Sequence, residues 1–355
     1  MKRLLHTLLF GGSILWLSMM AVRGLPVSAI ADDRMQKDGD LYHIDAQIIL
    51  PGELDTLALS ERQLEYAGQV DLEFAAKALL TPEEYGRLLF KEVNYTDYER
   101  GGTTYTAQNA TIEKDNAIKA EIFSYDGFFS YYRSLPDDVL QIDWTEGWGI
   151  YTPDNEAKNC ALSAQQAKAL ADEAIHSLQL PFDTQWLITR AYSPTETTYL
   201  NKGYYELVYQ QLIDGVPVAV NNQKLFRTSN DRSKFYPHEI YGVIVKVFDT
   251  GIHSITCYWA TAKDFPDDRT VNLSVQEAVE LFSQYFDKNK SLDIAPVPLT
   301  VDRIALEYAV CENSDGLLVL TPSWSFLHMG KKQAFYGLRL SAVDGAVLLF
   351  NGWTI

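Results

Sequence analysis

Apolar positions recur with helical spacing in two segments that share nearly the same sequence. Residues 162–170 read LSAQQAKAL, and residues 273–281 read LSVQEAVEL. Apolar side chains then repeat every three or four positions over residues 167–178 and again over residues 275–286. This period is typical of helices that bury one face. The pattern therefore predicts a duplicated unit that begins with an amphipathic helix.

Both helix starts carry the same capping signal. Ser163 is followed three residues later by Gln166, and Ser274 is followed in the same way by Glu277. In such a capping box the serine side chain accepts a hydrogen bond from the third helical residue, whose side chain accepts one from the serine backbone. The two helices are therefore predicted to begin directly after Ser163 and Ser274.

The hydrophobic period changes from helical spacing to alternation after each helix. Residues 204–213 and 304–310 alternate and lead to Asp-Gly pairs, which are strong hairpin signals between apolar runs. A second hairpin is predicted to close each copy. The four predicted turns lie at Asp214-Gly215, Asp315-Gly316, residues 249–251 and Asp344-Gly345. Each copy is thus expected to be one helix packed on an antiparallel sheet.

The region before residue 156 shows no clear third copy. A strand is predicted over residues 42–50, and helices are predicted to begin at Ser60, with Gln63 completing a capping box, and at Thr81, with Pro82 at the first helical position. Further strands are predicted over residues 105–107 and 117–132. We therefore expect an α+β fold with three parts. These parts are an N-terminal α+β lobe at 32–155 and two units at 156–268 and 269–355.

The first 31 residues have the order of a secretory signal peptide. MKRLLH carries two positive charges, an apolar run follows over residues 8–22, and Ala29 and Ala31 form an A-x-A cleavage site. The run is shorter than the roughly 18 residues of a membrane span. We expect cleavage after Ala31 and an extracytoplasmic, secreted or cell-surface protein. The alternative is a retained membrane anchor, because Arg23 follows the apolar run.

The chain is strongly acidic. Its formal charge is −17, and removal of residues 1–31 leaves 27 basic against 47 acidic residues, or −20. Such a field repels nucleic acid, whose binding begins with Lys and Arg meeting phosphates. Nucleic acid is therefore excluded as a partner, and a membrane is expected as one only if the N-terminal segment is retained.

Residue types that carry chemistry are sparse and scattered. The sequence has no nucleophile elbow, P-loop, dinucleotide fingerprint or zinc-protease motif. Cys160, Cys257 and Cys311 form no C-x-x-C pair and are expected to be packing residues, although one disulfide with a spare thiol stays open. We therefore expect no catalytic residues, no metal site and no cofactor.

A helix that opens L-S-x-x-x-A-x-x-L and is followed by strand pairs and an Asp-Gly hairpin resembles PepSY-like domains. The phrases LTPSWSF at 320–326 and AVDGAVLLF at 342–350 belong to the same resemblance, which covers residues 157–355. The tandem arrangement is similar to the YycH and YycI type of extracytoplasmic regulators and to related clostridial secreted or lipoprotein-like proteins of unknown function. The resemblance implies regulation, protease inhibition or sensing by protein contact, with no catalytic residues.

Aromatic residues crowd into one short segment and are the candidate binding residues. Successive side chains of a strand face opposite sides, so one set of rings is free to form a platform for a protein or sugar if the other set is core. The candidate residues are Tyr125, Phe128, Phe129, Tyr131 and Tyr132.

Three functions stay open at the level of sequence. The leading hypothesis is a non-enzymatic, secreted or cell-envelope protein that binds or regulates an unidentified cell-envelope or extracellular protein. One alternative is a carbohydrate- or peptidoglycan-binding module, with a glycan as the ligand. The other is a hydrolase whose carboxylates converge only in three dimensions.

Overall fold

The structure is a computed structural model, and it is described here within residues 30–350. The described residues are 30–51, 59–66, 68–97, 103–114, 117–135, 152–154, 156–193, 202–220, 241–264, 269–289, 299–312, 317–329 and 334–350. The predicted signal peptide up to residue 29 and the predicted turn at Asp315-Gly316 lie outside this part of the chain.

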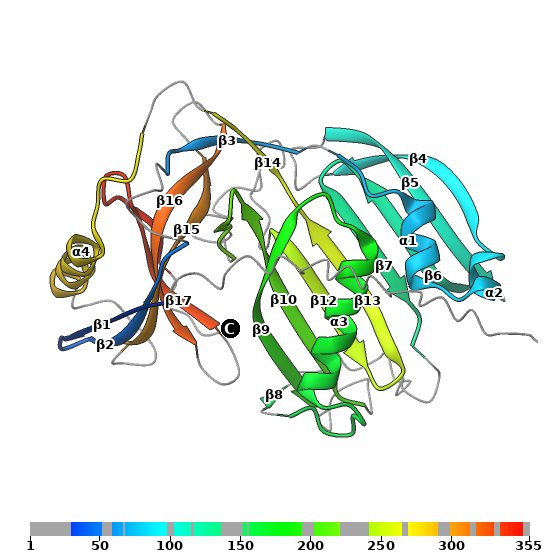
Figure 1. The fold of residues 1–355 in the computed structure, drawn as a ribbon, viewed down its shortest axis with the longest axis horizontal. Coiled ribbons are helices and arrows are strands. Elements are labelled where there is room, and N and C mark those ends of the chain that lie inside the picture. The colour runs from blue at the N-terminus through cyan, green and yellow to red at the C-terminus, as the bar shows by residue number, and fades with distance from the viewer. Residues whose placement is uncertain are drawn as a thin grey trace, which may run out of the picture.

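The molecule is built from two antiparallel-rich sheets with helices on their faces (Figure 1). The larger sheet has the strand order β4-β5-β6-β7-β13-β12-β10-β9-β8, and the smaller sheet has the order β1-β2-β15-β16-β17-β18. The predicted α+β class is confirmed, although strands dominate and form two sheets.

The first predicted repeat is a helix followed by a meander of four antiparallel strands. Helix α3 (Ala164–Leu178) precedes β9 (Asp183–Ser193), β10 (Tyr204–Ile213), β12 (Gly242–Phe248) and β13 (Gly251–Tyr258), which pair in chain order. The two-residue β11 (Val216–Pro217) folds back on β10 through the predicted Asp214-Gly215 turn. We call this part the α3 unit.

The second repeat has the same order of elements. Helix α4 (Val275–Lys288) precedes β15 (Leu299–Glu312), β16 (Leu318–Met329), β17 (Ala334–Ser341) and β18 (Val347–Phe350), again paired in chain order. We call it the α4 unit. Both predicted helices, and the antiparallel strands expected after each, are therefore confirmed.

A third helix-and-meander unit lies near the N-terminus, where the sequence showed no clear copy. Helix α1 (Leu72–Leu79) and the short α2 (Pro82–Tyr85) precede β4 (Leu89–Asp97), β5 (Thr103–Lys114), β6 (Ala117–Tyr125) and β7 (Phe128–Arg133). These strands pair in order, and β7 then pairs with β13. This α1 unit therefore continues the sheet of the α3 unit.

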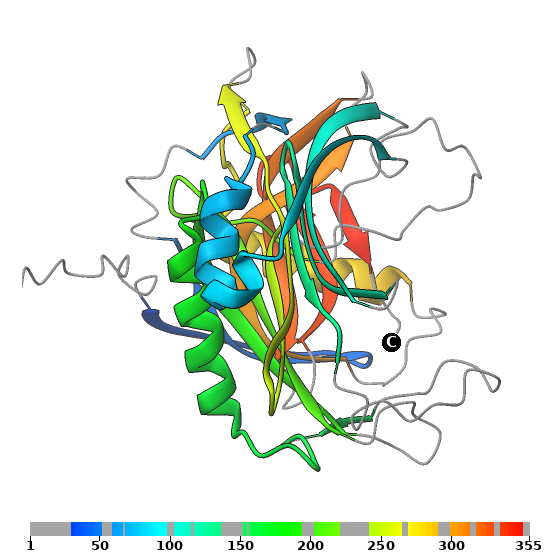
Figure 2. The same cartoon turned by 90° about the vertical axis from the view of Figure 1, so that its right-hand side faces the viewer.

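Helices α1 and α3 lie side by side on one face of the larger sheet (Figures 1 and 2). The core beneath them includes Ala75, Ala76, Ala167 and Ala171, none of which is exposed to solvent. Alanine side chains let a helix approach a sheet and a neighbouring helix closely. The small side chains thus make room for two helices over one continuous sheet.

The first strands of the chain belong to the smaller sheet. Strand β1 (Ile30–Asp38) pairs with β2 (Tyr42–Ile49), which runs parallel to β15. Strand β3 (Arg62–Glu65) pairs with β16 and with β14 (Thr261–Asp264), which follows β13. Strand pairing therefore crosses the boundaries predicted at residues 155 and 268. The division into domains stays a prediction.

Two predictions for the N-terminal region need correction. The helix predicted from Ser60 is wrong, because residues 62–65 form β3, and the helix begins instead after Asp71, whose side chain caps it. The strand predicted over residues 117–132 is two strands joined at Asp126-Gly127. The helix predicted at Thr81 is confirmed with its capping box but spans only four residues. The short β8 (Thr152–Asp154) ends the larger sheet beside β9.

Candidate functional site

The five predicted binding residues do not share one surface. Phe129 and Tyr131 are buried in the core between the larger sheet and its helices, so they are core residues and not a platform. Tyr125 is also buried, on the opposite face, while Phe128 is partly exposed and Tyr132 is 43% exposed. The turn at Asp126-Gly127 places Tyr125 directly opposite Phe128, which puts these two rings on one face.

Tyr125 and Phe128 belong to a larger group of rings that five adjacent strands assemble. We call this group the aromatic face. It lies on the side of the larger sheet opposite α1 and α3, because the alternate residues of the same strands fill the helix-side core. The aromatic face consists of Tyr95, Tyr105, Phe123, Tyr125, Phe128 and Tyr258.

The rings of the aromatic face touch in an unbroken series. Tyr125 lies at the centre, with ring centroids 5.1 Å from Tyr95, 5.1 Å from Tyr105 and 4.8 Å from Phe128. Phe128 continues the series to Tyr258 at 4.8 Å. Centroid distances of this size stabilise aromatic pairs beyond the area that they bury. The ring at the centre is buried, while Tyr95 is 39% exposed and the others are partly exposed.

Strand register explains why these rings meet. Tyr95 lies directly opposite Tyr105 in the β4–β5 pair, and Phe128 lies opposite Tyr258 in the β7–β13 pair. Residues directly opposite each other are the closest side-chain neighbours in a sheet, and aromatic pairs there are favourable. Because the partners are as much as 130 residues apart in the sequence, no local pattern could have predicted which rings meet across these strands.

A second series of rings leads away from Tyr132. His253 contacts Tyr132 with centroids 4.9 Å apart and Phe248 with centroids 5.3 Å apart, and Tyr204 continues the series from Phe248. Burial lowers the pKa of His253 to about 4, against a weaker opposing effect of the Arg133 backbone. The imidazole is therefore neutral near pH 7 and serves as a packing ring.

Buried charge joins the two sheets. Glu307 of β15 and Arg339 of β17 are almost fully buried, and the guanidinium Nη2 lies 3.6 Å from the Glu307 Oε1. Gln210 of the larger sheet donates from Nε2 to the Glu307 Oε2 at 3.0 Å, and Arg339 donates to the Ser325 hydroxyl and to the Val220 carbonyl. Removing one partner of such a group leaves an uncompensated buried charge, so the arrangement fixes how the sheets meet.

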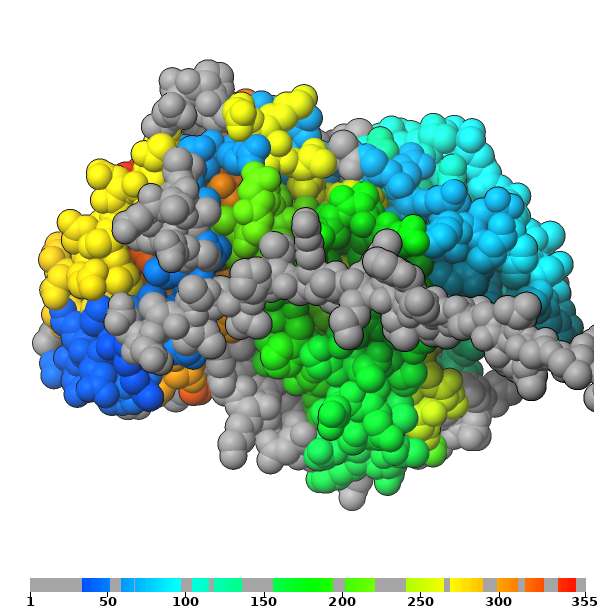
Figure 3. Space-filling view, viewed as in Figure 1, coloured from blue at the N-terminus to red at the C-terminus, as the bar shows by residue number. Residues whose placement is uncertain are grey.

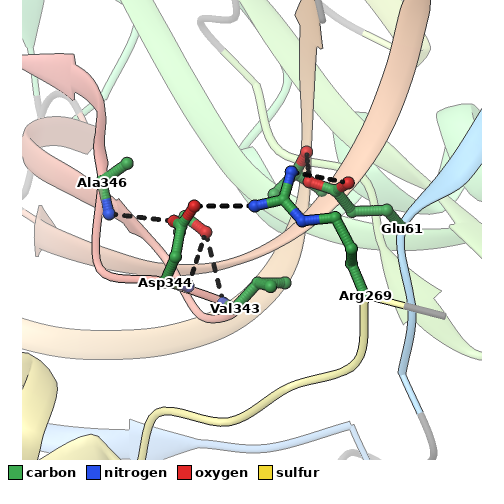
Figure 4. A network of polar contacts seen from close by, with 7 residues as sticks. Glu61, Arg269, Val343, Asp344 and Ala346 are labelled. Atoms are coloured by element: carbon green, nitrogen blue, oxygen red, sulfur yellow. Dashed lines mark hydrogen bonds and ion pairs between the residues drawn. The ribbon is translucent and has the colours of Figure 1, made fainter. Parts of the chain in front are cut away.

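Arg269 forms a second polar junction, at the start of the α4 unit (Figure 4). Its Nη1 donates to Glu61 at 3.2 Å and its Nη2 donates to Asp344 at 2.7 Å. Glu61 also accepts a hydrogen bond from Thr321, and Asp344 accepts one from the Ala346 backbone. Arg269 thereby ties the approach to α4 to β16 and to the Asp344-Gly345 turn.

The three cysteines are unpaired thiols, as expected for packing residues. Complete burial raises the pKa of Cys257, and burial raises the pKa of Cys311 to about 11. The pKa of Cys160 is also raised, mainly by desolvation. A thiol with a raised pKa is a poor nucleophile near pH 7, because the thiolate is the reactive form.

Carboxyl groups with shifted pKa values favour the charged form. Hydrogen bonds from the Ser274 side chain and backbone lower the pKa of Glu277, and hydrogen bonds from Arg34 and Gln36 lower that of Asp45. A hydrolytic acid needs the opposite shift. Nowhere in the described parts of the chain do three or more His, Cys, Asp or Glu side chains gather in a geometry that suits a metal ion.

None of the helices within the described residues has the length and apolar character that a membrane crossing requires.

Comparison with known proteins shows a shared fold. The sequence matches no protein-family model, and no curated protein matches it significantly. The structure is similar to the crystal structure of an uncharacterized protein from Eubacterium rectale, with a TM-score of 0.54 and 14% sequence identity. The similarity covers 88% of this chain and 92% of the other, so both sheets belong to a fold that the two proteins share. The resemblance to PepSY-like domains stays a prediction.

Proposed function

We propose that this protein is a non-enzymatic binding protein that acts outside the cytoplasm, and that it holds a partner protein on the aromatic face of its larger sheet. The observation that carries the proposal is the continuous series of six rings, contributed by five adjacent strands and partly exposed around a buried centre. The partner is expected to be a cell-envelope or extracellular protein, in agreement with the secretory pattern of residues 1–31.

The physical properties of the aromatic face suit a protein interface. Tyrosine supplies a large contact area with few rotatable bonds, and it is enriched among the residues that dominate binding energy. Here Tyr95, Tyr105 and Phe128 are held by neighbouring rings and by paired strands, so binding would order few additional side chains. A surface that is already rigid pays a smaller entropic cost on association.

The three groups with the most strongly shifted pKa values are all shifted mainly by burial. The pKa of Tyr209 is raised mainly by burial and also by its hydrogen bond to Asp172, and the pKa of His253 is lowered mainly by burial. The pKa of Cys257 is raised by burial alone. The lowered pKa makes His253 a weak base, and the raised pKa values keep Tyr209 and Cys257 protonated near pH 7, which makes them poor nucleophiles.

Alanine substitutions on the aromatic face test the proposal. The double variant Tyr105→Ala/Phe128→Ala is expected to lose capture of a cell-envelope protein that the wild-type protein retains from an extract of the source organism. Loss of two interface aromatics commonly weakens binding by about 2 kcal/mol or more, which corresponds to about 30-fold in Kd. The identified partner is then measured by titration with both proteins purified.

A matched control separates this effect from general damage to the larger sheet. Trp186 is 44% exposed and lies on the opposite face of the larger sheet, where Lys168 of α3 stacks over its ring. Trp186→Ala is expected to leave capture unchanged. Equal loss of capture in both variants, or full capture by the double variant, would contradict the proposal.

A glycan is the second candidate ligand. Four of the six rings of the aromatic face are tyrosines, which combine a flat apolar ring with a hydroxyl group and so suit stacking against a sugar. Sedimentation with purified peptidoglycan distinguishes the two candidates. Co-sedimentation that Tyr105→Ala/Phe128→Ala abolishes would favour the glycan over a protein partner.

A further inference from the structure

The four strands at the ends of the two sheets differ in length and in the side chains that they expose at their unpaired edges. Strands β8 and β18 have three and four residues, which is too short to guide another strand. Strand β1 has nine residues, but its described side chains include Arg34, Lys37 and Asp38. Short and charged edges are the usual means by which proteins prevent edge-to-edge pairing.

Strand β4 also carries charged residues, including the exposed Lys91 and Glu92, but unlike the other three it is both long and lined with exposed large apolar side chains. It is nine residues long, and it pairs with β5 in unbroken register from Leu89 to Asp97. Among the residues that the structure describes, no strand pairs with its other edge. Leu89 is 56% exposed, Phe90 is 49% exposed and Tyr95 is 39% exposed. A long and regular edge that exposes apolar side chains is a template for another strand.

Exposed apolar side chains are concentrated at this end of the molecule. Nine large hydrophobic residues of the described chain are exposed, and Phe74 of α1 together with Leu89, Phe90 and Tyr95 of β4 makes up four of them. Figure 3 shows α1, α2 and β4 as the surface of this end, coloured blue to cyan. Leu89 and Tyr95 face one side of the sheet and Phe90 faces the other, so this end of the molecule exposes apolar side chains on both faces of the edge strand.

We propose that β4 pairs antiparallel with β4 of a second copy of this chain, about a twofold axis that runs midway between Val93 of one copy and Val93 of the other. A twofold axis perpendicular to the sheet keeps each face of the sheet on the same side in both copies, so the larger sheet continues through the dimer. The occupant of the edge is therefore a second copy, and both copies use the same nine residues.

The two pairs of side chains nearest the axis are complementary in this register. With Val93 on the axis, Lys91 lies opposite Tyr95 of the second copy, where an ammonium group and an aromatic ring attract each other. Glu92 lies opposite Asn94, a pair that can share a hydrogen bond. Shifting the axis to Glu92 would place two glutamates directly opposite each other, which is destabilising.

Charges next to the edge are largely neutralised within each copy. On α2, Glu83 pairs with Arg87 at 2.6 Å and Glu84 pairs with Arg133 at 2.9 Å. Local repulsion at the interface is thus small, although each copy carries −17 overall. Since long-range repulsion between the copies is screened by salt, dimerisation is expected to strengthen as ionic strength rises.

Complementary charges at the axis test the pairing. Sedimentation velocity of the full chain is expected to show a dimer for the wild-type protein and monomers for Val93→Lys and for Val93→Glu, because each variant places like charges opposite each other. An equimolar mixture of the two variants is expected to restore a dimer, since lysine then meets glutamate on the axis. Partner binding at the aromatic face would not produce this pattern, so the two proposals fail separately.

Two controls keep the test decisive. Ile118→Lys changes a residue that is 44% exposed on β6, an inner strand of the same sheet, and is expected to leave the dimer intact. Leu89→Glu/Phe90→Glu changes only exposed side chains of the edge and is expected to weaken dimerisation at least about tenfold, even if Val93 variants fail to fold. A monomeric wild-type protein at all concentrations and salt levels, or an unchanged dimer in the double variant, would overturn the proposal.

Discussion

Helices α3 and α4 begin with the same type of capping box but bury side chains of different size. Each serine cap accepts from the backbone of the third helical residue at 3.3 Å, and each serine backbone donates back to that side chain at 2.9 Å. The buried face of α3 is mainly alanine, whereas that of α4 contains Phe282 and Phe286. The start of the helix is thus the same while the packing surface has diverged.

The difference in the size of the buried side chains goes with a difference in how the two sheets are covered. Phe282 and Phe286 pack together over the smaller sheet, and the Phe282 ring centroid lies 5.3 Å from that of Tyr42 and 4.5 Å from that of Phe326. Helix α3 leaves room beside it, and α1 packs there with alanines of its own. A larger covered sheet results, and its opposite face carries the aromatic face. Small buried side chains thus accompany two helices on one sheet, whereas large ones accompany a single helix on the other.

The largest effect is expected from emptying the core under α4. Phe282→Ala should destabilise the protein by about 3–5 kcal/mol, because a fully buried ring is replaced by a cavity. Chemical denaturation with a constant m-value measures the change. If the free energy of unfolding falls by less than about 1 kcal/mol, the core over the smaller sheet must collapse into the cavity, which would contradict a rigid core.

Overfilling the core under α3 is the matching change. Ala171→Leu adds volume at a position that is not exposed at all and should cost about 1–3 kcal/mol through overpacking. The same denaturation series reports it. If the leucine were neutral or stabilising, close approach of α3 to the sheet would not be the reason for its alanines.

Sequence reasoning predicted the repeated unit because its signals are local. Capping boxes and Asp-Gly turns act within a few residues, and both helices start where Ser163 and Ser274 indicated. The same signal misled at Ser60, because pairing of β3 with distant β14 and β16 outweighs a local cap. The α1 unit was missed because its helix has only eight residues and is capped by Asp71 without the capping box.

Loss of either cap should have a smaller and nearly equal effect. Ser163→Ala and Ser274→Ala are each expected to cost about 1 kcal/mol, the usual cost of an N-cap side chain. The two costs should add in the double variant, since the sites lie in separate units and share no partner. Denaturation midpoints of the three variants measure this. Strong non-additivity would argue that the two helix starts are coupled.

The smallest expected effect is a pH dependence that only one cap has. Glu277 closes the α4 box with a carboxylate, whereas Gln166 closes the α3 box with a neutral amide. The Ser274 side chain and backbone lower the pKa of Glu277 below its ordinary 4.5 in the folded protein. Its stabilisation is thus complete above pH 4.5 and is lost as the pH falls through the lowered value.

Glu277→Gln isolates this contribution. The variant should reduce the decline of unfolding free energy below pH 4.5, and the converse change Gln166→Glu should increase it. Denaturation of both variants is measured between pH 3 and pH 7, a range that spans the ordinary carboxyl pKa of about 4. The same pH profile in all three proteins would contradict the assignment.

The candidate site was only partly predictable. Crowded aromatics pointed to β6 and β7, and alternation implied that the rings would divide between two faces. The hairpin at Asp126-Gly127 and the register with β4, β5 and β13 decide which rings meet. Such pairing depends on contacts between distant segments, so the sequence alone could not place Tyr95 or Tyr258 beside Phe128.

Site-specific photo-crosslinking tests the central claim most directly, because it asks which face of the larger sheet meets a partner. A photoreactive phenylalanine derivative replaces Tyr105 on the aromatic face or Trp186 on the helix face, and the products formed in intact cells of the source organism are identified by mass spectrometry. Our account predicts one cell-envelope protein crosslinked at position 105 and absent at position 186. Crosslinks only at position 186, or none specific to position 105, would contradict it.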